Sequence, residues 1–352
     1  MTARDVYLKP TGIVCGKQAQ ELVAAGQAGW LAGRFVAFTH LELLSRNGNG
    51  PDGGSYAGIK ASNEHLLVEA LESLGAEPAP VSGLDFTQPH IMGILNVTPD
   101  SFSDGGLFAE AATAIAHGRR LVEEGAHILD IGGESTRPGA DKVTEEDEIA
   151  RVIPVLEGLE DSGTVLSCDT RNAPVMKAAA SAGAHIINDV SALGHDPSAL
   201  ETAAALNLPV VLMHSQGEPK TMQQDPQYED VCLDVFDTLE QRIAVCEAAG
   251  IERSKIIADP GIGFGKTFDH NLQLIDGLTL FHGLGVPLML GASRKAFIGA
   301  VTGTKTAGER VQGSVAVALA GLIRGAHLFR VHDVAETAQA FATFSAISRQ
   351  SI

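Results

Sequence analysis

Eight short apolar runs, separated by longer segments of helical character, occupy the chain from residue 90 onward. The runs are continuously apolar rather than alternating with polar residues, which indicates strands buried on both faces of a parallel sheet. Eight β-then-α units in about 250 residues predict a closed (β/α)8 TIM barrel of the α/β class. The runs are IMGILNV (91–97), HILDIGG (127–133), TVLSCD (164–169), HIINDV (185–190), PVVLMH (209–214), KIIADP (255–260), PLMLGAS (287–293) and HLFRVH (327–332).

The segments between the runs carry helix start and stop signals. Thr144 is followed three residues later by Asp147, the spacing of a capping box at a helix N-terminus. Four glycines stand where such helices should end: Gly125, Gly183, Gly250 and Gly325. The alternative architecture is an open doubly wound sheet. The barrel is favoured because no GxGxxG motif follows the first strand.

The first 88 residues do not follow this alternation. The glycine-rich stretch 47–58 predicts a loop, and the proline-punctuated stretch 77–89 predicts a linker. Residues 62–74, followed by a glycine, predict one amphipathic helix. We therefore expect an N-terminal extension (1–88) and a barrel (89–350). The extension is interpreted as a packed appendage rather than a partner-binding element, and the sequence assigns it no chemistry.

The charge and the apolar pattern exclude several classes of protein. A net charge of -18 argues against a wide nucleic-acid or anionic-membrane surface. The chain has no signal-peptide pattern and no apolar run of about 18 residues, so we expect a cytoplasmic protein without membrane contact. The four cysteines form no CxxC pair and are interpreted as reduced thiols, with Cys168 a small buried strand residue.

The active site of such a barrel lies at the C-terminal ends of its strands. Polar side chains near the barrel mouth cost desolvation unless they find partners. They could pair with one another to close the barrel top. Because every predicted strand ends in this way, a polar ligand is the better interpretation. The residues at these ends are Asn96, Glu134, Ser135, Thr136, Arg137, Asp169, Asn188, Asp189, Met213, His214, Asp259, Arg294, Lys295, Arg330 and His332.

The residue types suggest a subsite for a flat heterocycle. Asp169, Asn188 and Asp259 offer carboxylate and amide oxygens, which suit a ring edge that presents NH and NH2 donors.

A second group of residues suits phosphate oxygens. Arg330 and His332 are two residues apart on one predicted strand, so their side chains share a face. The amide oxygen of Asn96 could contact a magnesium ion that a diphosphate already holds. Ser135 has no obvious base, and no cysteine lies in an activating setting. We therefore expect displacement of a phosphate-type leaving group without a covalent enzyme intermediate, with His332 as a general base the less favoured alternative.

Several motifs together resemble the dihydropteroate synthase family over about residues 90 to 345. The resemblance implies a transferase that condenses (7,8-dihydropterin-6-yl)methyl diphosphate with 4-aminobenzoate and releases diphosphate. The family is described as using an SN1-like path with Mg2+. The motifs are GILNVTPDSFSDGG, DIGGESTRPGA, SCDT, HIINDV, LMHSQGEPKTMQ, DPGIGFGK, SRK and RVHDV.

The resemblance also implies roles for individual residues. The pterin would be held by Asp169, Asn188, Asp259 and Lys295, with Met213 and Phe264 in the apolar walls. Asn96 would meet the magnesium ion, and Thr136, Arg330 and His332 would hold the diphosphate. The loops around 100–106 and 135–140, Arg137 included, would close over the site. The residues expected to act in catalysis are Asn96, Arg137, Lys295, Arg330 and His332.

One departure from the family pattern concerns the arylamine. Ala296 follows SRK where the family usually has Ser, which removes a hydroxyl expected near the aminobenzoate carboxylate. We expect weaker aminobenzoate or sulfonamide binding without loss of activity. The change also keeps open a synthase that uses a modified arylamine, as in methanopterin-type pathways.

Two other functions compete with this one. A pterin-dependent methyltransferase would share Asp169, Asn188 and Asp259 but would not need the diphosphate loop. A non-catalytic paralogue would be indicated by loss of Asn96, Arg137 or Lys295, and all three are present. Because members of the family are usually dimers, we also expect a homodimer formed through the C-terminal helices.

Overall fold

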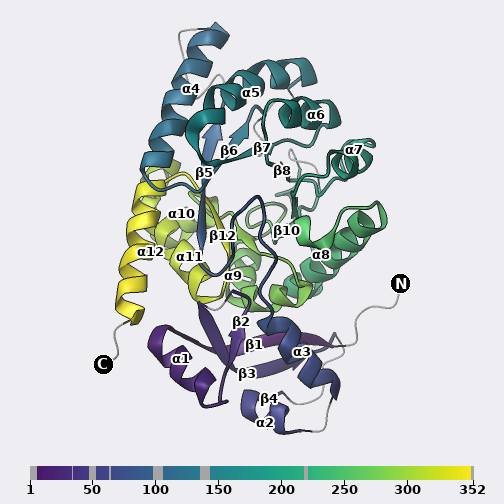
Figure 1. The fold of residues 1–352 in the computed structure, drawn as a ribbon, viewed down its shortest axis with the longest axis vertical. Helices are drawn as coiled ribbons and strands as arrows, with labels where there is room; N and C mark the ends of the chain where they lie inside the picture. Colours follow the sequence, from purple (N-terminus) through teal and green to yellow (C-terminus); the bar gives the residue numbers. More distant parts are fainter. Residues whose placement is uncertain are drawn as a thin grey trace.

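The computed structural model describes residues 6–33, 35–46, 53–62, 65–97, 106–134, 143–217 and 221–349. These residues form two parts, an N-terminal antiparallel sheet with its helices and a barrel of parallel strands surrounded by helices (Figure 1). The N-terminal part lies at one end of the longest axis of the molecule, beside helices of the barrel (Figure 1).

The barrel confirms the predicted fold. Its strands pair in parallel in the order β10-β9-β8-β7-β6-β5-β12-β11. A parallel bridge between Ala258 and Leu288 joins β10 to the chain just before β11, which closes the ring. The strands are β5 (His90–Asn96), β6 (Ile128–Gly132), β7 (Val165–Asp169), β8 (Ile186–Asp189), β9 (Val210–Met213), β10 (Ile256–Asp259), β11 (Met289–Leu290) and β12 (Leu328–Val331).

Helices follow the strands and cover the outside of the barrel (Figure 1). The Thr144 hydroxyl accepts a hydrogen bond from the Asp147 amide at 3.1 Å, so the predicted cap begins its helix. The helices are α4 (Gly106–Glu123), α5 (Glu145–Leu159), α6 (Ala173–Ser181), α7 (Ala199–Leu206), α8 (Val231–Ala248), α9 (Phe268–Asp276), α10 (Ala296–Thr302), α11 (Val311–Ile323) and α12 (Val334–Arg349). Short 3-10 segments are η2 (Glu160–Ser162), η3 (Arg253–Lys255), η4 (Gly277–Leu284) and η5 (Ala307–Glu309).

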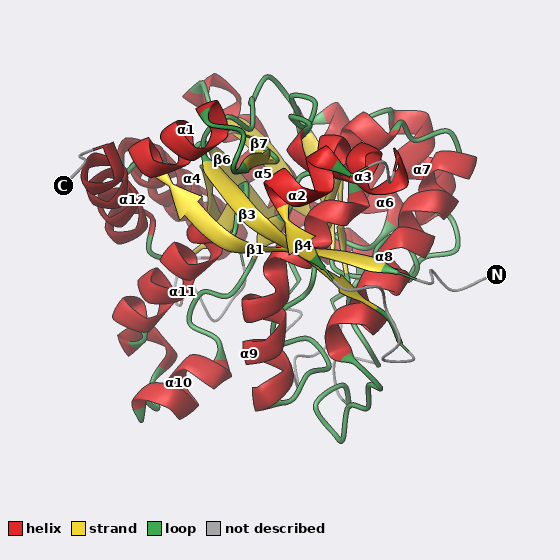
Figure 2. Ribbon diagram, turned by 90° about the horizontal axis from the view of Figure 1, so that it is seen from below, coloured by secondary structure: helices red, strands yellow, loops and turns green. Residues whose placement is uncertain are grey.

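The N-terminal part contains a small antiparallel sheet, which was not predicted from the sequence (Figure 2). Its strands run in the order β1-β3-β2, and β4 pairs with β3. A hydrophobic cluster built around Phe38 and Leu41 joins the sheet to its helices. The elements are β1 (Tyr7–Cys15), α1 (Gly16–Ala24), β2 (Gly29–Leu31), β3 (Val36–Leu44), β4 (Gly54–Ser55), α2 (Tyr56–Ala61) and α3 (His65–Gly75).

The loop predicted over 47–58 is wrong in its second half. Gly54 pairs with Leu41, and the Ser55 hydroxyl caps α2 by accepting from the Gly58 amide at 3.2 Å. Residues 47–52 lie outside the described residues. The single helix expected over 62–74 corresponds to α3, which begins three residues later and is preceded by α2.

The stretch predicted as a linker is packed into the base of the barrel. Val81 and Phe86 are buried in one cluster with apolar side chains from the first half of the barrel strands. Hydrogen bonds between the backbones of Val81 and Leu84 hold the turn. Phe86 also packs edge-on against His327, with the two ring centroids 5.4 Å apart. This segment therefore seals the end of the barrel opposite to the site.

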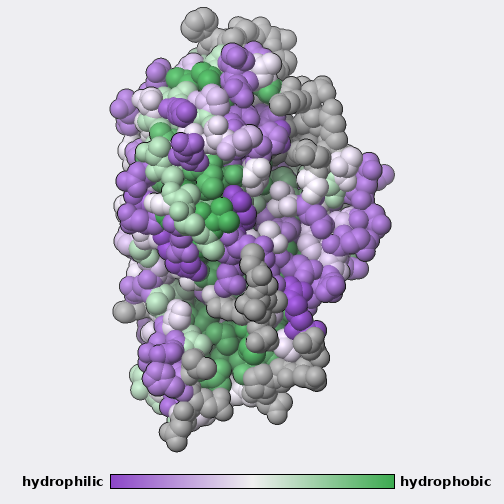
Figure 3. All heavy atoms as spheres, turned by 90° about the vertical axis from the view of Figure 1, so that its right-hand side faces the viewer, coloured by the Kyte–Doolittle hydropathy of each residue, from purple (hydrophilic) through white to green (hydrophobic). Residues whose placement is uncertain are grey.

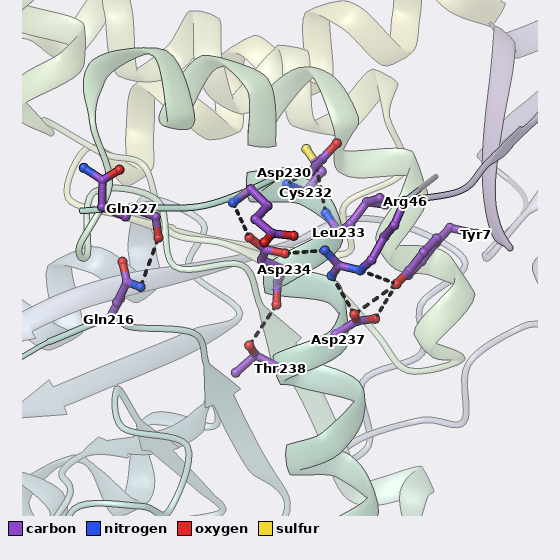
Figure 4. A network of polar contacts seen from close by, with 11 residues as sticks. Tyr7, Arg46, Gln216, Gln227, Asp230, Cys232, Leu233, Asp234, Asp237 and Thr238 are labelled. Carbon is purple, nitrogen blue, oxygen red and sulfur yellow. Dashed lines mark hydrogen bonds and ion pairs between the residues drawn. The ribbon is translucent and has the colours of Figure 1, made fainter. Parts of the chain in front are cut away.

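Polar contacts attach the N-terminal sheet to α8 (Figure 4). The Arg46 guanidinium donates from Nη1 to Asp234 and from Nη2 to Asp237, each at 2.7 Å. The Tyr7 hydroxyl also donates to Asp237, and its ring packs edge-on against Phe236. A second attachment joins β1 to η4, where the Thr279 hydroxyl donates to the Pro10 carbonyl at 2.8 Å.

The surface on the side of α7 and α8 is largely hydrophilic, with hydrophobic patches between the hydrophilic residues (Figure 3). Among the described residues, no helix has the length and apolar character that a membrane span requires.

Candidate active site

Side chains that point into the barrel form layers with a period of two residues. The lower layer is apolar, and its members include Ile128, Ile186, Val211, Ile257 and Leu328. The next inward-facing side chains lie two residues further along the same strands. They are polar or belong to the predicted site. These positions are Asp130, Asn188, Met213, Asp259 and Arg330. The strand period therefore brings the predicted site residues of four strands to one level above a sealed apolar base.

Strand register aligns the next group of residues. Asn96 at the end of β5 is the register partner of Gly132 on β6. Gly132 is in turn the partner of Asp169 on β7, and Asp169 is the partner of Asn188 on β8. A Cβ added at Gly132 would lie 3.3 Å from the Asp169 Cβ, so glycine leaves room beside this carboxylate. Asn96 and Asp169 therefore lie on the same rim, two strands apart.

Arg330 connects three of the strands. Its Nε donates to Asp130 and its Nη2 donates to Asp169, each at 2.6 Å. Asp130 also accepts from Asn188 Nδ2 at 2.9 Å and from the Ser167 hydroxyl at 2.6 Å. The predicted phosphate residue Arg330 is thus joined directly to the predicted pterin residue Asp169, and through Asp130 to the predicted pterin residue Asn188.

Burial sets the protonation of these groups. Burial raises the pKa of Asp169 to about 7, opposed by the attraction of Arg330. Burial acts to lower the pKa of Arg330, but Asp130 and Asp169 outweigh it and the pKa is raised, so the guanidinium stays charged. Asp169 is consequently poised between its charged and neutral forms near neutral pH.

Lys295 and Asp259 form a second charged group. Lys295 lies at the start of α10, and its Nζ donates to the Ile262 carbonyl and lies 4.1 Å from the centre of the Phe264 ring. Burial lowers the pKa of Lys295 to about 7, opposed by Asp259. Burial raises the pKa of Asp259, opposed chiefly by Lys295. The structure therefore brings Lys295, Phe264 and Asp259 together.

The two groups meet at Gly291, the residue after β11. A Cβ added at Gly291 would lie 3.3 Å from Asp259 Oδ2 and 3.8 Å from Arg330 Cβ. The small residue lets the Asp259 carboxylate and the Arg330 side chain approach each other.

Met213 lies beside Asp259, because these two residues are partners in the β9–β10 pairing. Met213 is buried, and Phe264 is half-buried. His214 follows Met213 in the chain, and the buried Lys266 donates to His214 Nδ1 at 2.9 Å and to the Phe264 carbonyl at 3.0 Å. Burial lowers the pKa of His214 to about 3, so its ring is neutral and accepts this bond.

His332 lies at the end of β12 and contacts Ser293. Its Nδ1 is 3.0 Å from the Ser293 hydroxyl, and its backbone amide donates to the same hydroxyl at 3.2 Å. The neighbouring Arg294 is turned to Asp333, with Nε donating at 3.1 Å. Arg294 is therefore engaged in an ion pair, whereas Lys295 next to it faces the site.

Thr136 and Arg137 lie outside the described residues, as do the whole of the expected closing loop at 135–140 and residues 100–105 of the one at 100–106. The residue just before the second loop is anchored. Glu134 receives two hydrogen bonds of 3.0 Å from the Arg171 guanidinium, and both side chains are largely buried.

Asp130 and Lys266 were not predicted from the sequence as site residues. A signal for Asp130 was present, because a carboxylate inside the apolar run HILDIGG must find buried partners. Lys266 had no comparable signal, since a lysine in a loop usually reaches solvent.

Comparisons with known proteins agree with this arrangement. The family model of pterin binding enzymes matches residues 92–332. Dihydropteroate synthase of Escherichia coli (strain K12) is 49% identical over 260 residues, which cover 74% of this chain and 92% of that protein. The corresponding protein of Neisseria meningitidis serogroup B is 51% identical over 270 residues, or 75% and 94% of the two chains.

Solved structures show the same relationship. The dihydropteroate synthase of Xanthomonas albilineans with 4-aminobenzoic acid has a TM-score of 0.73 and 48% sequence identity, covering 78% of this chain and 99% of that chain. A complex of the enzyme from the same organism with 7,8-dihydropteroate has a TM-score of 0.69 and 46% identity, covering 76% and 97%. The chain belongs to the pterin binding enzyme family and, within it, to the dihydropteroate synthases.

Proposed function

We propose that this chain condenses (7,8-dihydropterin-6-yl)methyl diphosphate with 4-aminobenzoate to give 7,8-dihydropteroate and diphosphate. The observation that carries the proposal is the joined set of Asp169, Asp130 and Arg330, which places hydrogen-bond acceptors and a fixed cation in one inward-facing group. Membership of the dihydropteroate synthases supports the same reaction.

The pterin ring is assigned to the acceptor side of this group. Its edge presents NH and NH2 donors, and Asp169, Asn188 and Asp259 supply oxygens that can accept them. Met213 and Phe264 provide apolar contact beside these oxygens. Lys295, whose Nζ lies over the Phe264 ring and is attracted by the Asp259 carboxylate, adds a donor for a ring carbonyl.

The diphosphate is assigned to the cationic side. Arg330 on β12 and His332 directly after this strand supply N–H donors, while Thr136, in the chain segment between β6 and α5, adds a hydroxyl. A magnesium ion fits the donor set only in part. Asn96 offers one neutral amide oxygen, and the described residues contain no cluster of three His, Cys, Asp or Glu side chains able to hold an ion. An ion at this place would be held by Asn96 and by oxygens of the substrate, and would neutralise charge on the leaving group.

The chemistry follows from these placements. The bond between the pterin methylene and the diphosphate oxygen breaks, and its electron pair leaves with the diphosphate. Arg330 and His332 stabilise the growing negative charge, an effect that fixed donors in a water-poor site make large. The amine of 4-aminobenzoate then attacks the cationic methylene and loses a proton to water. Arg137, which lies between β6 and α5 in the sequence, is assigned to this step by its place in the family motif.

Diphosphate release tests the function directly. With the pterin diphosphate and 4-aminobenzoate together, the enzyme should release one diphosphate for each dihydropteroate formed. Strong release only with a different arylamine would favour the methanopterin-type alternative. Absence of release with any arylamine, together with methyl transfer from a methylated pterin, would establish the methyltransferase instead.

We also propose that two copies of the chain associate through α11. Ser314, Ala318 and Leu322 form the buried stripe of this helix, and the adjacent stripe of Val315, Leu319 and Ile323 is apolar and only half-buried. A helix that is apolar on both stripes is typical of one that a second chain covers.

A further inference from the structure

Asp130 is a charged residue at the centre of the site that the assigned pterin and diphosphate contacts do not use. It lies in the middle of β6, and its side chain has no solvent exposure. One carboxylate oxygen, Oδ1, accepts from the Ser167 hydroxyl, and the other, Oδ2, accepts from both Asn188 Nδ2 and Arg330 Nε. An ionised carboxylate accepts hydrogen bonds and donates none, so every neighbour must turn a donor toward it.

This requirement fixes the direction of the Asn188 amide. With the NH2 group facing Asp130, the Oδ1 atom of Asn188 must point to the opposite side. We propose that Asp130 is a positioning residue that makes Asn188 present an acceptor, and thereby selects a pterin that carries a 2-amino group. This inference rests on the proposed function, because it assumes that the pterin edge meets Asn188.

Asp130 holds Arg330 by the same oxygen. The guanidinium is planar, so a bond at Nε to Asp130 and a bond at Nη2 to Asp169 together set its orientation. The position of the Arg330 guanidinium and the direction of the Asn188 side-chain amide thus both depend on one buried atom, Asp130 Oδ2. A ligand with a carbonyl in place of the 2-amino group would set an acceptor against the Asn188 oxygen and be rejected.

The test compares two probes, 6-hydroxymethylpterin and its 2-oxo analogue 6-hydroxymethyllumazine, by calorimetric titration. In Asp130→Ala the Asn188 amide can rotate, so the preference for the 2-amino probe should fall about tenfold, the value of one hydrogen bond. Asp130→Asn can keep an oxygen toward Asn188 and Arg330 while its NH2 group faces Ser167. This conservative variant should therefore retain the wild-type preference within about twofold.

Glu148→Ala is the matched control. Glu148 is also a buried carboxylate with an amide partner, since it accepts from Asn172 Nδ2 at 2.7 Å. Its loss removes the same chemical group, but its amide partner is Asn172 and not Asn188, so the preference should be unchanged. If Asp130 served only to stabilise the fold, both alanine variants would unfold more readily and neither would change the preference.

An unchanged preference in Asp130→Ala would overturn the role of Asp130 and leave the proposed function intact. Wild-type protein that binds neither probe would overturn both. If Asp130→Ala does not fold, the wild type supplies the test through 15N-arginine NMR, with Arg330→Lys used to assign the signal. The Arg330 Nε–H should be shifted downfield and protected from solvent exchange, and a rapidly exchanging signal would refute the arrangement.

Discussion

Arg330 Nη2 lies 2.6 Å from Asp169 Oδ2, so a guanidinium on β12 is bonded to a carboxylate on β7. The two residues are 161 positions apart in the chain. Their contact joins the side of the site assigned to diphosphate with the side assigned to the pterin. Movement of one of these side chains therefore changes the environment of the other, and binding of the two halves of the substrate should be coupled.

Lys295→Ala should lower kcat/KM by about 100-fold or more while the protein stays folded, because it removes a fixed donor from the site. Steady-state kinetics with both substrates and circular dichroism measure the two effects. Lys305→Ala, an exposed lysine ten residues later, is the control and should have wild-type kinetics. Near-normal turnover in Lys295→Ala would remove this residue from the site.

Asp169 should make stability depend on pH. Its pKa is about 7 in the folded protein, against 3.8 as the ordinary value. Between these values the unfolded chain has lost the proton that the folded protein retains, so the contribution of Asp169 to stability is fully present below about pH 4 and is lost as pH rises through 7. The total effect is a few kcal/mol at most, roughly 1.4 for each pKa unit.

Urea unfolding at several pH values measures this effect. In Asp169→Asn the free energy of unfolding should decrease less between pH 4 and pH 7 than it does in the wild type. Asp269→Asn changes an exposed aspartate on α9, and its free energy of unfolding should depend on pH as it does in the wild type. Parallel curves for the wild type and Asp169→Asn would contradict the raised pKa.

Ala296→Ser should improve binding of 4-aminobenzoate. Ala296 is the exposed first residue of α10, directly after Lys295, and the serine adds the hydroxyl usual in the family. One neutral hydrogen bond lowers KM for the arylamine by a factor of about 2 to 10. Ala300→Ser on the same helix is the control. An unchanged KM in Ala296→Ser would show that position 296 does not contact the arylamine.

Arg46→Ala should destabilise the attachment of the N-terminal sheet. The variant loses two ion pairs with α8 and leaves Asp237 without its cation. Because these side chains are partly exposed, we expect a loss of about 1 to 2 kcal/mol in the free energy of unfolding. Lys60→Ala breaks a more exposed ion pair to Glu72 and should change stability by less than about 0.5 kcal/mol. Equal stability of the two variants would contradict this account.

Light scattering tests the proposed dimer. The wild type should have twice the chain mass of 36.7 kDa at micromolar concentration. Leu319→Glu places a charge on the half-buried stripe of α11 and should give a monomer. Gln241→Glu on α8 should remain a dimer. A monomeric wild type would refute the association.

The barrel was predictable from the sequence because its signal is local. A strand buried on both faces needs a continuous apolar run, and the helices between the runs need caps and terminal glycines. Asp169 and Asp259 could be selected as site residues because each ends such a run. The N-terminal sheet was not predictable. Its central strand β3 pairs on both sides, and buried and exposed residues do not alternate regularly along it, so the strand has no clear period of two.

The amino-acid order by itself determined the strands, their sequence and which residue ends each of them, because periodicity and chain breaks depend on near neighbours. Only the tertiary structure decided which of these residues touch. Arg294 turns to Asp333, whereas the adjacent Lys295 faces Phe264. Asp130 becomes the common partner of Asn188 and Arg330 only when the sheet closes. Contacts of this kind depend on the curvature of the whole sheet and on the desolvation of charges inside it, and neither is encoded in any short stretch of sequence.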